Sequence, residues 1–277
     1  MALLVPRLED YEKSVEEMTD FFSWIKDEIH WIIYGSFINR KIRPGLSDID
    51  IFILKISKDI SFPIWISKDI GEMRDKVERN WIPLQINRQT TAWLKSTTFS
   101  PEYNYLMEVT KWIDAWYVSN DLPDLFMENR NKSRDDRDML RHFARKVNSL
   151  WEWLAKVELI VKIQESEITM QNQKDLWKFW DNFKKMLSLC VLAVRVETQE
   201  SYFARSDQFI MNRFTDIFNP GVDISRYIGI MRSTHDIRDW YSYLKNWWIE
   251  ELQDIYTDIF IPLINAIDNK LWTQKIQ

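Results

Sequence analysis

"YGSFINRKIRPGLSDIDIFIL", residues 34 to 54, holds two of the five glycines of a 277-residue chain. An apolar segment ends at a Gly-Ser pair, a polar loop follows, and two aspartates then alternate with isoleucines. Residues two apart on a strand point to the same face. We therefore expect Asp48 and Asp50 to project together while the isoleucines between and after them enter a core. The stretch predicts a strand, a tight turn, a loop and a second strand.

Two neighbouring carboxylates suit a divalent cation. They repel each other unless a cation lies between them, and Mg²⁺ binds a small number of carboxylates together with phosphate oxygens and water. A lone D-x-D sequence is common and by itself is weak evidence for a metal site. The order of strand, Gly-Ser, loop and Ser-Asp-x-Asp is more specific. It favours Asp48 and Asp50 as metal-binding and catalytic residues.

The loop before the aspartates carries features suited to a phosphate chain. Without a Cβ at Gly35, phosphate oxygens can approach the backbone, and Ser36 can donate its hydroxyl. Arg40 and Lys41 can neutralise phosphate charge, although basic residues in a loop are more often simply solvated. Ser47 would orient the start of the second strand.

Turn residues divide the chain into two halves. Six of the eight prolines precede residue 124, and neither proline nor glycine occurs from 124 to 219. Such a stretch permits long helices. We expect an α+β fold with an N-terminal domain at 1–125 that contains a small mixed sheet, and a helical bundle at 126–277.

Periodicity predicts the elements of both halves. In the first half, a helix covers 8–28 and strands cover "HWIIYG", "DIDIFIL" and "WIPLQIN"; Pro83 favours an edge position for the last strand. In the second half, one helix starts at a Ser133–Asp136 capping box and runs to about Ile163. Further helices cover about 174–198 and 236–275. The apolar faces predicted to enter the two cores are Tyr11, Val15, Met18, Phe22 and Ile25; Leu140, Ala144, Val147, Trp151 and Leu154; and Leu176, Trp180, Phe183, Leu187, Cys190 and Val194.

Composition narrows the class of protein. The net charge of -5 argues against nucleic acid as a main partner. The N-terminus does not resemble a signal peptide, no window is apolar enough to span a bilayer, and a single cysteine allows no intramolecular disulfide. We expect a cytoplasmic protein with no membrane partner.

The motif resembles the signature of the DNA polymerase β-like nucleotidyltransferases in their small bacterial and archaeal branch. Together with the helical second half, "YGSF…SDID" is similar to the antibiotic nucleotidyltransferases that act on lincosamides and aminoglycosides such as kanamycin. "KVNSLWEWLAKVEL" is similar to the first C-terminal helix of the lincosamide enzymes.

This resemblance implies an Mg²⁺-dependent transfer of AMP from ATP to a hydroxyl of a small molecule, such as an antibiotic, with release of pyrophosphate. Asp48 and Asp50 would bind Mg²⁺, and Gly35 and Ser36 would hold the β- and γ-phosphates. The helical domain would supply the acceptor pocket and a glutamate as general base, for which Glu152 is the nearest candidate. An ordinary solvated pairing with Lys156 explains Glu152 equally well. The aminoglycoside enzymes also imply a homodimer.

One feature departs from the family pattern. A third carboxylate is expected on a later strand, where this chain has Gln85 and Asn87. Either the alignment of that strand is shifted, the third group comes from elsewhere, or the catalytic centre is weakened. Two alternatives therefore stay open beside the small-molecule transferase. One is transfer to a protein or tRNA within a toxin–antitoxin pair, and the other is binding of a nucleotide or partner without turnover.

Overall fold

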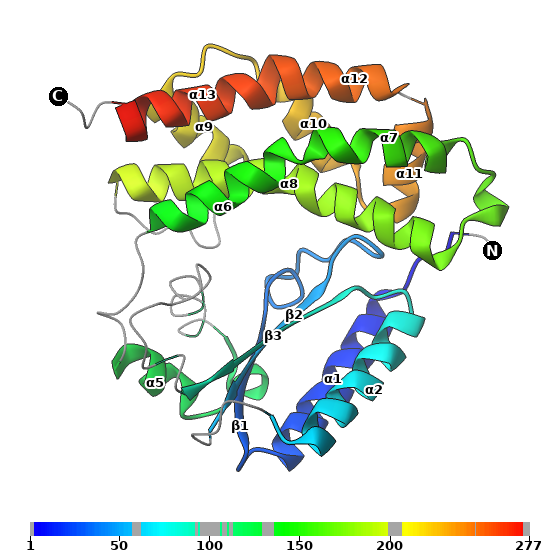
Figure 1. The fold of residues 1–277 in the computed structure, drawn as a ribbon, viewed down its shortest axis with the longest axis vertical. Coiled ribbons are helices and arrows are strands. Elements are labelled where there is room, and N and C mark those ends of the chain that lie inside the picture. Colours follow the sequence, from blue (N-terminus) through cyan, green and yellow to red (C-terminus); the bar gives the residue numbers. More distant parts are fainter. Residues whose placement is uncertain are drawn as a thin grey trace. The chain divides into compact units, whose positions relative to one another are not determined.

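The computed structural model describes residues 3–56, 62–91, 94, 106, 110, 113–128, 136–198, 207–246 and 248–273. The chain divides into two compact units. The N-terminal unit is Leu4–Arg134, and the helical unit is Asp135–Gln277 together with Met1–Leu3. The sequence predicted a division at 125 and 126. The fold is α+β: helices predominate, and one small mixed sheet accompanies them (Figure 1).

The sheet of the N-terminal unit has the order β1-β2-β3. β1 (Ile29–Tyr34) pairs antiparallel with β2 (Ile49–Lys55), and β2 pairs parallel with β3 (Leu84–Thr90). The parallel pair needs a crossover, and α2 (Ile64–Arg79) lies between β2 and β3 in the chain. Pro83 precedes β3 and accepts a hydrogen bond at its carbonyl from the N–H of Ile49 at 3.0 Å. The three predicted strands are confirmed, with the third starting three residues later than the predicted segment.

Two helices cover one face of the sheet. α1 (Leu8–Trp24) and α2 lie side by side in Figure 1 and are joined by an ion pair of 2.8 Å between Glu17 and Lys76. The helix predicted from 8 to 28 is confirmed but ends earlier. Its five predicted core residues all belong to the hydrophobic core, which also contains Ile49, Ile51 and Ile53 of β2. The predicted alternation along β2 is therefore correct on this face.

The other face of β2 is also buried. Phe52 contacts Phe126 of α5 (Leu122–Glu128) at a centroid distance of 5.8 Å. Beside β1, Ser119 follows η1 (Ala115–Tyr117) and binds Trp31 through its backbone and side chain. Because both faces are covered, β2 is apolar from Ile51 to Leu54, and its charged residues are Asp50 near the start, two residues after Asp48, and the buried Lys55 at the end. The aspartates thus mark the end of the strand that opens toward the loop.

Every described element of the helical unit is a helix. The longest described helix is α8. Their bounds are α6 (Asp136–Asn148), α7 (Leu150–Val161), η3 (Glu165–Glu167), α8 (Met170–Thr198), α9 (Asp207–Phe218), α10 (Ser225–Ser233), α11 (Ile237–Asn246), α12 (Trp248–Ile255), η4 (Tyr256–Phe260), α13 (Ile261–Asp268) and η5 (Asn269–Thr273).

The prediction of a single helix up to Ile163 is wrong. It is interrupted at Ser149, whose Oγ donates to the carbonyl of Lys146 at 2.8 Å. A serine that bonds back to the preceding turn competes with the helical ladder and bends it. The interruption changes which side chains face inward: Leu150 and Leu154 are buried, whereas Trp151, predicted as core, is 51% exposed. Ser133, the predicted N-cap, lies outside the described residues.

Aromatic side chains form the core of the helical unit. Trp180 and Phe183 of α8 surround Trp240 of α11, with ring centroids 5.0 and 5.3 Å from it. The inward face predicted for α8 is confirmed except at Leu187, which is half-buried while its neighbours Met186 and Leu189 are fully buried. Trp180 and Trp240 are thus core residues of this unit.

Candidate functional site

Gly35 and Asp50 meet at the end of the β1–β2 pair. Gly35 follows β1 directly and has φ +84°, a conformation that L side chains rarely adopt. A Cβ at this position would overlap Oδ2 of Asp50 and lie 3.0 Å from its Cγ. The glycine is therefore required twice, by its backbone and by the carboxylate beside it. This close approach explains why a chain poor in glycine has one here.

Asp48 and Ser36 lie at the same corner. Asp48 is 5% exposed, Asp50 is half-buried, and the Ser36 hydroxyl donates to the Asp48 carbonyl at 3.3 Å. The turn after Gly35 is one helical turn, because the N–H of Asn39 donates to the Gly35 carbonyl at 3.2 Å.

The first N–H groups of this turn are available to a ligand. Among the described residues, no acceptor is found for the backbone N–H groups of Ser36, Phe37 and Ile38. Successive N–H groups of this kind form an anion-binding concavity. The corner therefore combines backbone N–H donors with the carboxylate of Asp50.

A buried tyrosine fixes the loop that leads into β2. Tyr11 of α1 is fully buried; its hydroxyl donates to the Ser47 carbonyl at 2.9 Å and accepts from the N–H of Gly45 at 3.1 Å. Ser47 in turn accepts from the N–H of Arg43 at 2.8 Å through its Oγ. Tyr11 was predicted only as a core residue. Its role in holding the loop has no local sequence signal, because its partners are more than thirty residues away.

Arg40 and Lys41 lie on the exposed side of the same loop. Arg40 adopts φ +52°, and the backbone N–H of Lys41 donates to the Ser36 carbonyl at 2.9 Å. The loop therefore folds back on its own first turn. Both side chains belong to the segment that carries the Gly-Ser turn, as the sequence predicted, but a phosphate-binding role stays a prediction.

Gln85 lies beside Asp50 in the sheet. The two residues are partners in the parallel register of β2 and β3, and Gln85 is exposed. The sequence placed Gln85 on the strand where the resemblance implies a third carboxylate, and that correspondence stays a prediction. An amide oxygen can bind a cation but brings no charge.

The residues of this corner fit an Mg²⁺ ion that arrives with a nucleotide. Mg²⁺ in nucleotide sites is commonly held by one or two carboxylates plus phosphate oxygens and water. Within the part of the chain that the structure describes, there is no group of three or more His, Cys, Asp or Glu side chains suited to a metal. Two carboxylates and one amide are ligand types that Mg²⁺ accepts beside phosphate oxygens and water, and their metal-binding role stays a prediction.

Glu152, the predicted general base, belongs to the helical unit. It is exposed on the first turn of α7, and its N–H donates to the Ser149 carbonyl at 3.1 Å. Lys156, its expected partner, has its ammonium 4.6 Å from the ring centroid of Trp153. The structure describes Glu152 and the two aspartates in different units, so its catalytic role stays a prediction.

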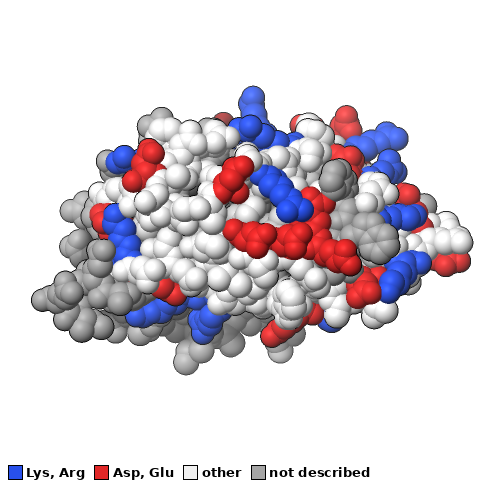
Figure 2. All heavy atoms as spheres, turned by 90° about the horizontal axis from the view of Figure 1, so that it is seen from above, with Lys and Arg blue, Asp and Glu red and all other residues white. Residues whose placement is uncertain are grey.

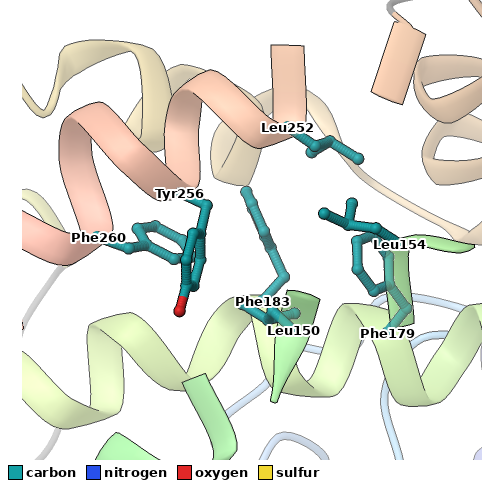
Figure 3. Close-up of a pocket in the computed structure, with 7 residues that line it drawn as sticks. All are labelled: Leu150, Leu154, Phe179, Phe183, Leu252, Tyr256 and Phe260. Atoms are coloured by element: carbon teal, nitrogen blue, oxygen red, sulfur yellow. The ribbon is translucent and has the colours of Figure 1, made fainter. Parts of the chain in front are cut away.

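Two hollows of the helical unit differ in size. A crevice between α7, α8 and the α12–η4 segment is lined by leucine and phenylalanine side chains and by Tyr256 (Figure 3), and it measures about 10 Å³. That is room for about one water molecule. A groove of about 550 Å³, where α9 ends beside α13, is lined in part by Asn219, Asn265 and Lys270. Only the groove has the size of a small-molecule site.

Comparison of the chain with protein-family models, curated proteins and solved structures gave no match. Among the described residues there is also no helix long and apolar enough to span a membrane. The corner formed by Gly35, Ser36, Asp48 and Asp50 is the candidate functional site.

Proposed function

We propose that the chain is an Mg²⁺-dependent nucleotidyltransferase that transfers AMP from ATP to a hydroxyl of a small molecule. The observation that carries this proposal is the approach of Gly35 to Asp50 at the end of β2. It brings a turn with available N–H donors next to paired carboxylates. The resemblance to the polymerase β-like signature supports the same reading, in which the N-terminal unit is the nucleotidyltransferase domain and the helical unit holds the acceptor.

Each residue of the corner has a role in this reaction. Asp48 and Asp50 would hold Mg²⁺, Gly35 leaves room for the Asp50 carboxylate beside the turn, and the Ser36 hydroxyl and turn N–H groups would donate to phosphate oxygens. A metal ion held there would supply neutralisation of charge on the triphosphate and on the pyrophosphate. The acceptor oxygen forms a bond to the α-phosphorus as the bond to the bridging oxygen of pyrophosphate breaks, and the hydroxyl proton passes to a base. The chain contributes mainly positioning and electrostatics.

Titration calorimetry with Mg·ATP tests the first step. We expect the wild-type protein to bind and the Asp48→Asn/Asp50→Asn variant to lose binding at least tenfold. The matched control is Asp20→Asn/Asp27→Asn, which removes the same charge from exposed positions of the same unit. Equal binding by all three proteins would refute the proposed site.

A second candidate function is nucleotide binding without transfer. Gln85 stands in register with Asp50 where the similar family has an acid, and no third acidic ligand is found among the described residues. Pyrophosphate release can be followed across a panel of hydroxyl acceptors for wild type and Gln85→Glu. Turnover by the wild type favours the transferase. Turnover gained only by Gln85→Glu, with unchanged ATP binding, favours the binding protein.

A further inference from the structure

The groove at the end of α9 is bordered by one face of α13 and of the start of η5. The residues of this face are Pro262, Asn265, Ala266, Asn269 and Lys270. Their spacing of three and four residues places them in one row along the helix. Leu263 and Ile267 of the same helix lie outside this row and are fully buried. The row itself is not closed by apolar packing, and it leaves a space of about 550 Å³ beside α9.

Three asparagines supply hydrogen-bonding side chains to the groove. Asn219 follows the last residue of α9, and Asn265 and Asn269 belong to the row on α13 and η5. All three are exposed, and no hydrogen-bond partner for their side-chain amides is found among the described residues. Each amide offers two N–H donors and an acceptor oxygen. A hydroxyl group, which also donates and accepts, is a suitable partner for every one of them.

The charge of the groove is already compensated. Among the described residues that line it, Lys270 is the one with a charged side chain. Its Nζ donates to the Ile217 carbonyl at 2.6 Å and lies 3.6 Å from Oε1 of Glu197 and 5.5 Å from the ring centroid of Phe218. These contacts engage the ammonium group within the protein. The groove therefore favours a neutral ligand.

The preceding part of the same run of helix is acidic. A band of Asp and Glu crosses the surface seen in Figure 2, and α12 and η4, which lead directly into α13, carry the exposed residues Glu250, Asp254 and Asp258. No acidic residue is among the described residues that line the groove. The side chains thus change from carboxylates to amides where the helix reaches the groove.

The walls of the groove are tied together. Lys270 joins η5 to the last turn of α9 through the Ile217 carbonyl. Asn219 adopts φ +45°, its N–H donates to the Thr215 carbonyl at 2.9 Å, and Pro220 follows it. The backbone of Asn219 is therefore restricted on both sides. A site that is formed before the ligand arrives lowers the cost of ordering on binding.

The groove also offers apolar contact. Pro262 and Ala266 are half-buried, and Phe218 is buried at the end of α9. A ligand that fits both kinds of group has hydroxyls at its edge and C–H groups on its face. The ring of a saccharide has this combination.

We propose that the groove between the end of α9 and α13 binds a neutral saccharide. The saccharide hydroxyls bond to the amides of Asn219, Asn265 and Asn269, while its C–H groups contact Pro262 and Ala266. The site lies within the helical unit and does not rest on the proposed transferase activity.

Calorimetry and saturation-transfer NMR with D-glucose and maltose test the proposal. We expect saturable binding by the wild type, and binding at least tenfold weaker by Asn265→Leu/Asn269→Leu, which removes two amides at exposed helical positions. Tighter binding of maltose would assign a disaccharide, and equal or weaker binding a monosaccharide. Absence of saturable binding of both sugars would overturn the proposal.

Two further ligands test the stated chemistry. Sorbitol carries hydroxyls on an open chain and should bind more weakly than glucose; equal or tighter binding would contradict a site for a ring. Glucuronate adds a carboxylate to the ring and should bind no more tightly than glucose. Tighter binding would show that the charge of Lys270 is available to a ligand, and it would overturn the assignment of a neutral one.

Control variants locate the site. Asn212→Leu/Asn246→Leu makes the same exchange at exposed helical positions that do not line the groove, and it should bind glucose and maltose like the wild type. Asp48→Asn/Asp50→Asn should also keep this binding, so failure here is separate from failure of the proposed transferase.

Filling the groove gives a second, independent loss. Ala266→Phe keeps all three amides but occupies the space between the walls, and it should weaken saccharide binding at least tenfold with an unchanged circular dichroism spectrum. Equal binding by the wild type, Ala266→Phe and Asn265→Leu/Asn269→Leu would place the saccharide outside the groove and overturn the inference.

Discussion

Asp50 in the N-terminal unit and Asp181 in the helical unit are carboxylates in opposite surroundings. Asp50 lies next to a glycine that leaves space beside it and two residues from another carboxylate. Asp181 lies among lysines contributed by two helices. The difference shows that the neighbours of a carboxylate bear on its use: Asp181 is compensated by lysines of its own unit, whereas for Asp48 and Asp50 we propose a cation brought by a ligand.

Loss of the Asp181 carboxylate is expected to have the largest effect, a decrease in the free energy of unfolding. Asp181→Asn removes the carboxylate from three lysines, and loss of one partner of a poorly exposed ion pair costs about 3 kcal/mol. We expect the free energy of unfolding in urea to fall by about that amount. Glu158→Gln, which affects an exposed pair with Lys162 at 2.7 Å, should cost no more than about 0.5 kcal/mol. Similar losses in both variants would contradict the difference in burial.

Gly35→Ala tests the surroundings of Asp50. The alanine is strained by the positive φ and its Cβ collides with Asp50, so we expect a loss of about 2 kcal/mol. Gly221→Ala is the matched control, because Gly221 has φ +69° but nothing within 4 Å of an added Cβ. It should lose about 1 kcal/mol, from strain alone. Urea unfolding of both variants measures the difference, and equal losses would mean that Asp50 moves aside freely.

The pH dependence of stability separates the two sites further. Burial is the largest single influence on the pKa of Asp181 and raises it, but the lysines together outweigh burial and lower the pKa in the folded protein. A depressed folded pKa stabilises the protein above the unfolded pKa of about 3.9, and this contribution is lost as the pH falls further. Between about pH 5 and pH 2, wild-type stability should therefore fall more steeply than that of Asp181→Asn. Identical slopes would show that Asp181 does not contribute.

The smallest effect on stability is expected at the proposed metal site. Asparagine keeps the shape of aspartate and can keep its hydrogen bonds, while the repulsion between Asp48 and Asp50 disappears. The Asp48→Asn/Asp50→Asn variant should therefore unfold within about 1 kcal/mol of the wild type, even though it loses Mg·ATP binding. A large destabilisation in urea would indicate that the aspartates are structural, as Asp181 is.

Local patterns predicted much of the N-terminal unit because its signals are local. Alternating isoleucines predicted β2, the helical spacing of Tyr11 to Ile25 predicted α1, and the Gly-Ser pair predicted the turn. The break at Ser149 was missed because the apolar period continues through it, and serine is common enough in helices to give no warning. α2 was not predicted although it completes the crossover to β3.

The sequence by itself determined the order of strand, Gly-Ser turn, loop and Asp-x-Asp strand, because each step depends on backbone preferences and on side-chain alternation over a few residues. Only the tertiary structure decided that the Gly35 backbone touches the Asp50 carboxylate, that Tyr11 holds the loop, and that Gln85 stands in register with Asp50. The tertiary structure also decided which charges surround Asp181 and how deeply it is buried. In the sequence, Lys184 and Lys185 form ordinary pairs with it three and four residues along a helix, and only packing against α6 adds Lys146 and removes much of the water. Contacts between residues far apart in the chain depend on how whole elements pack, and no short stretch of sequence records that.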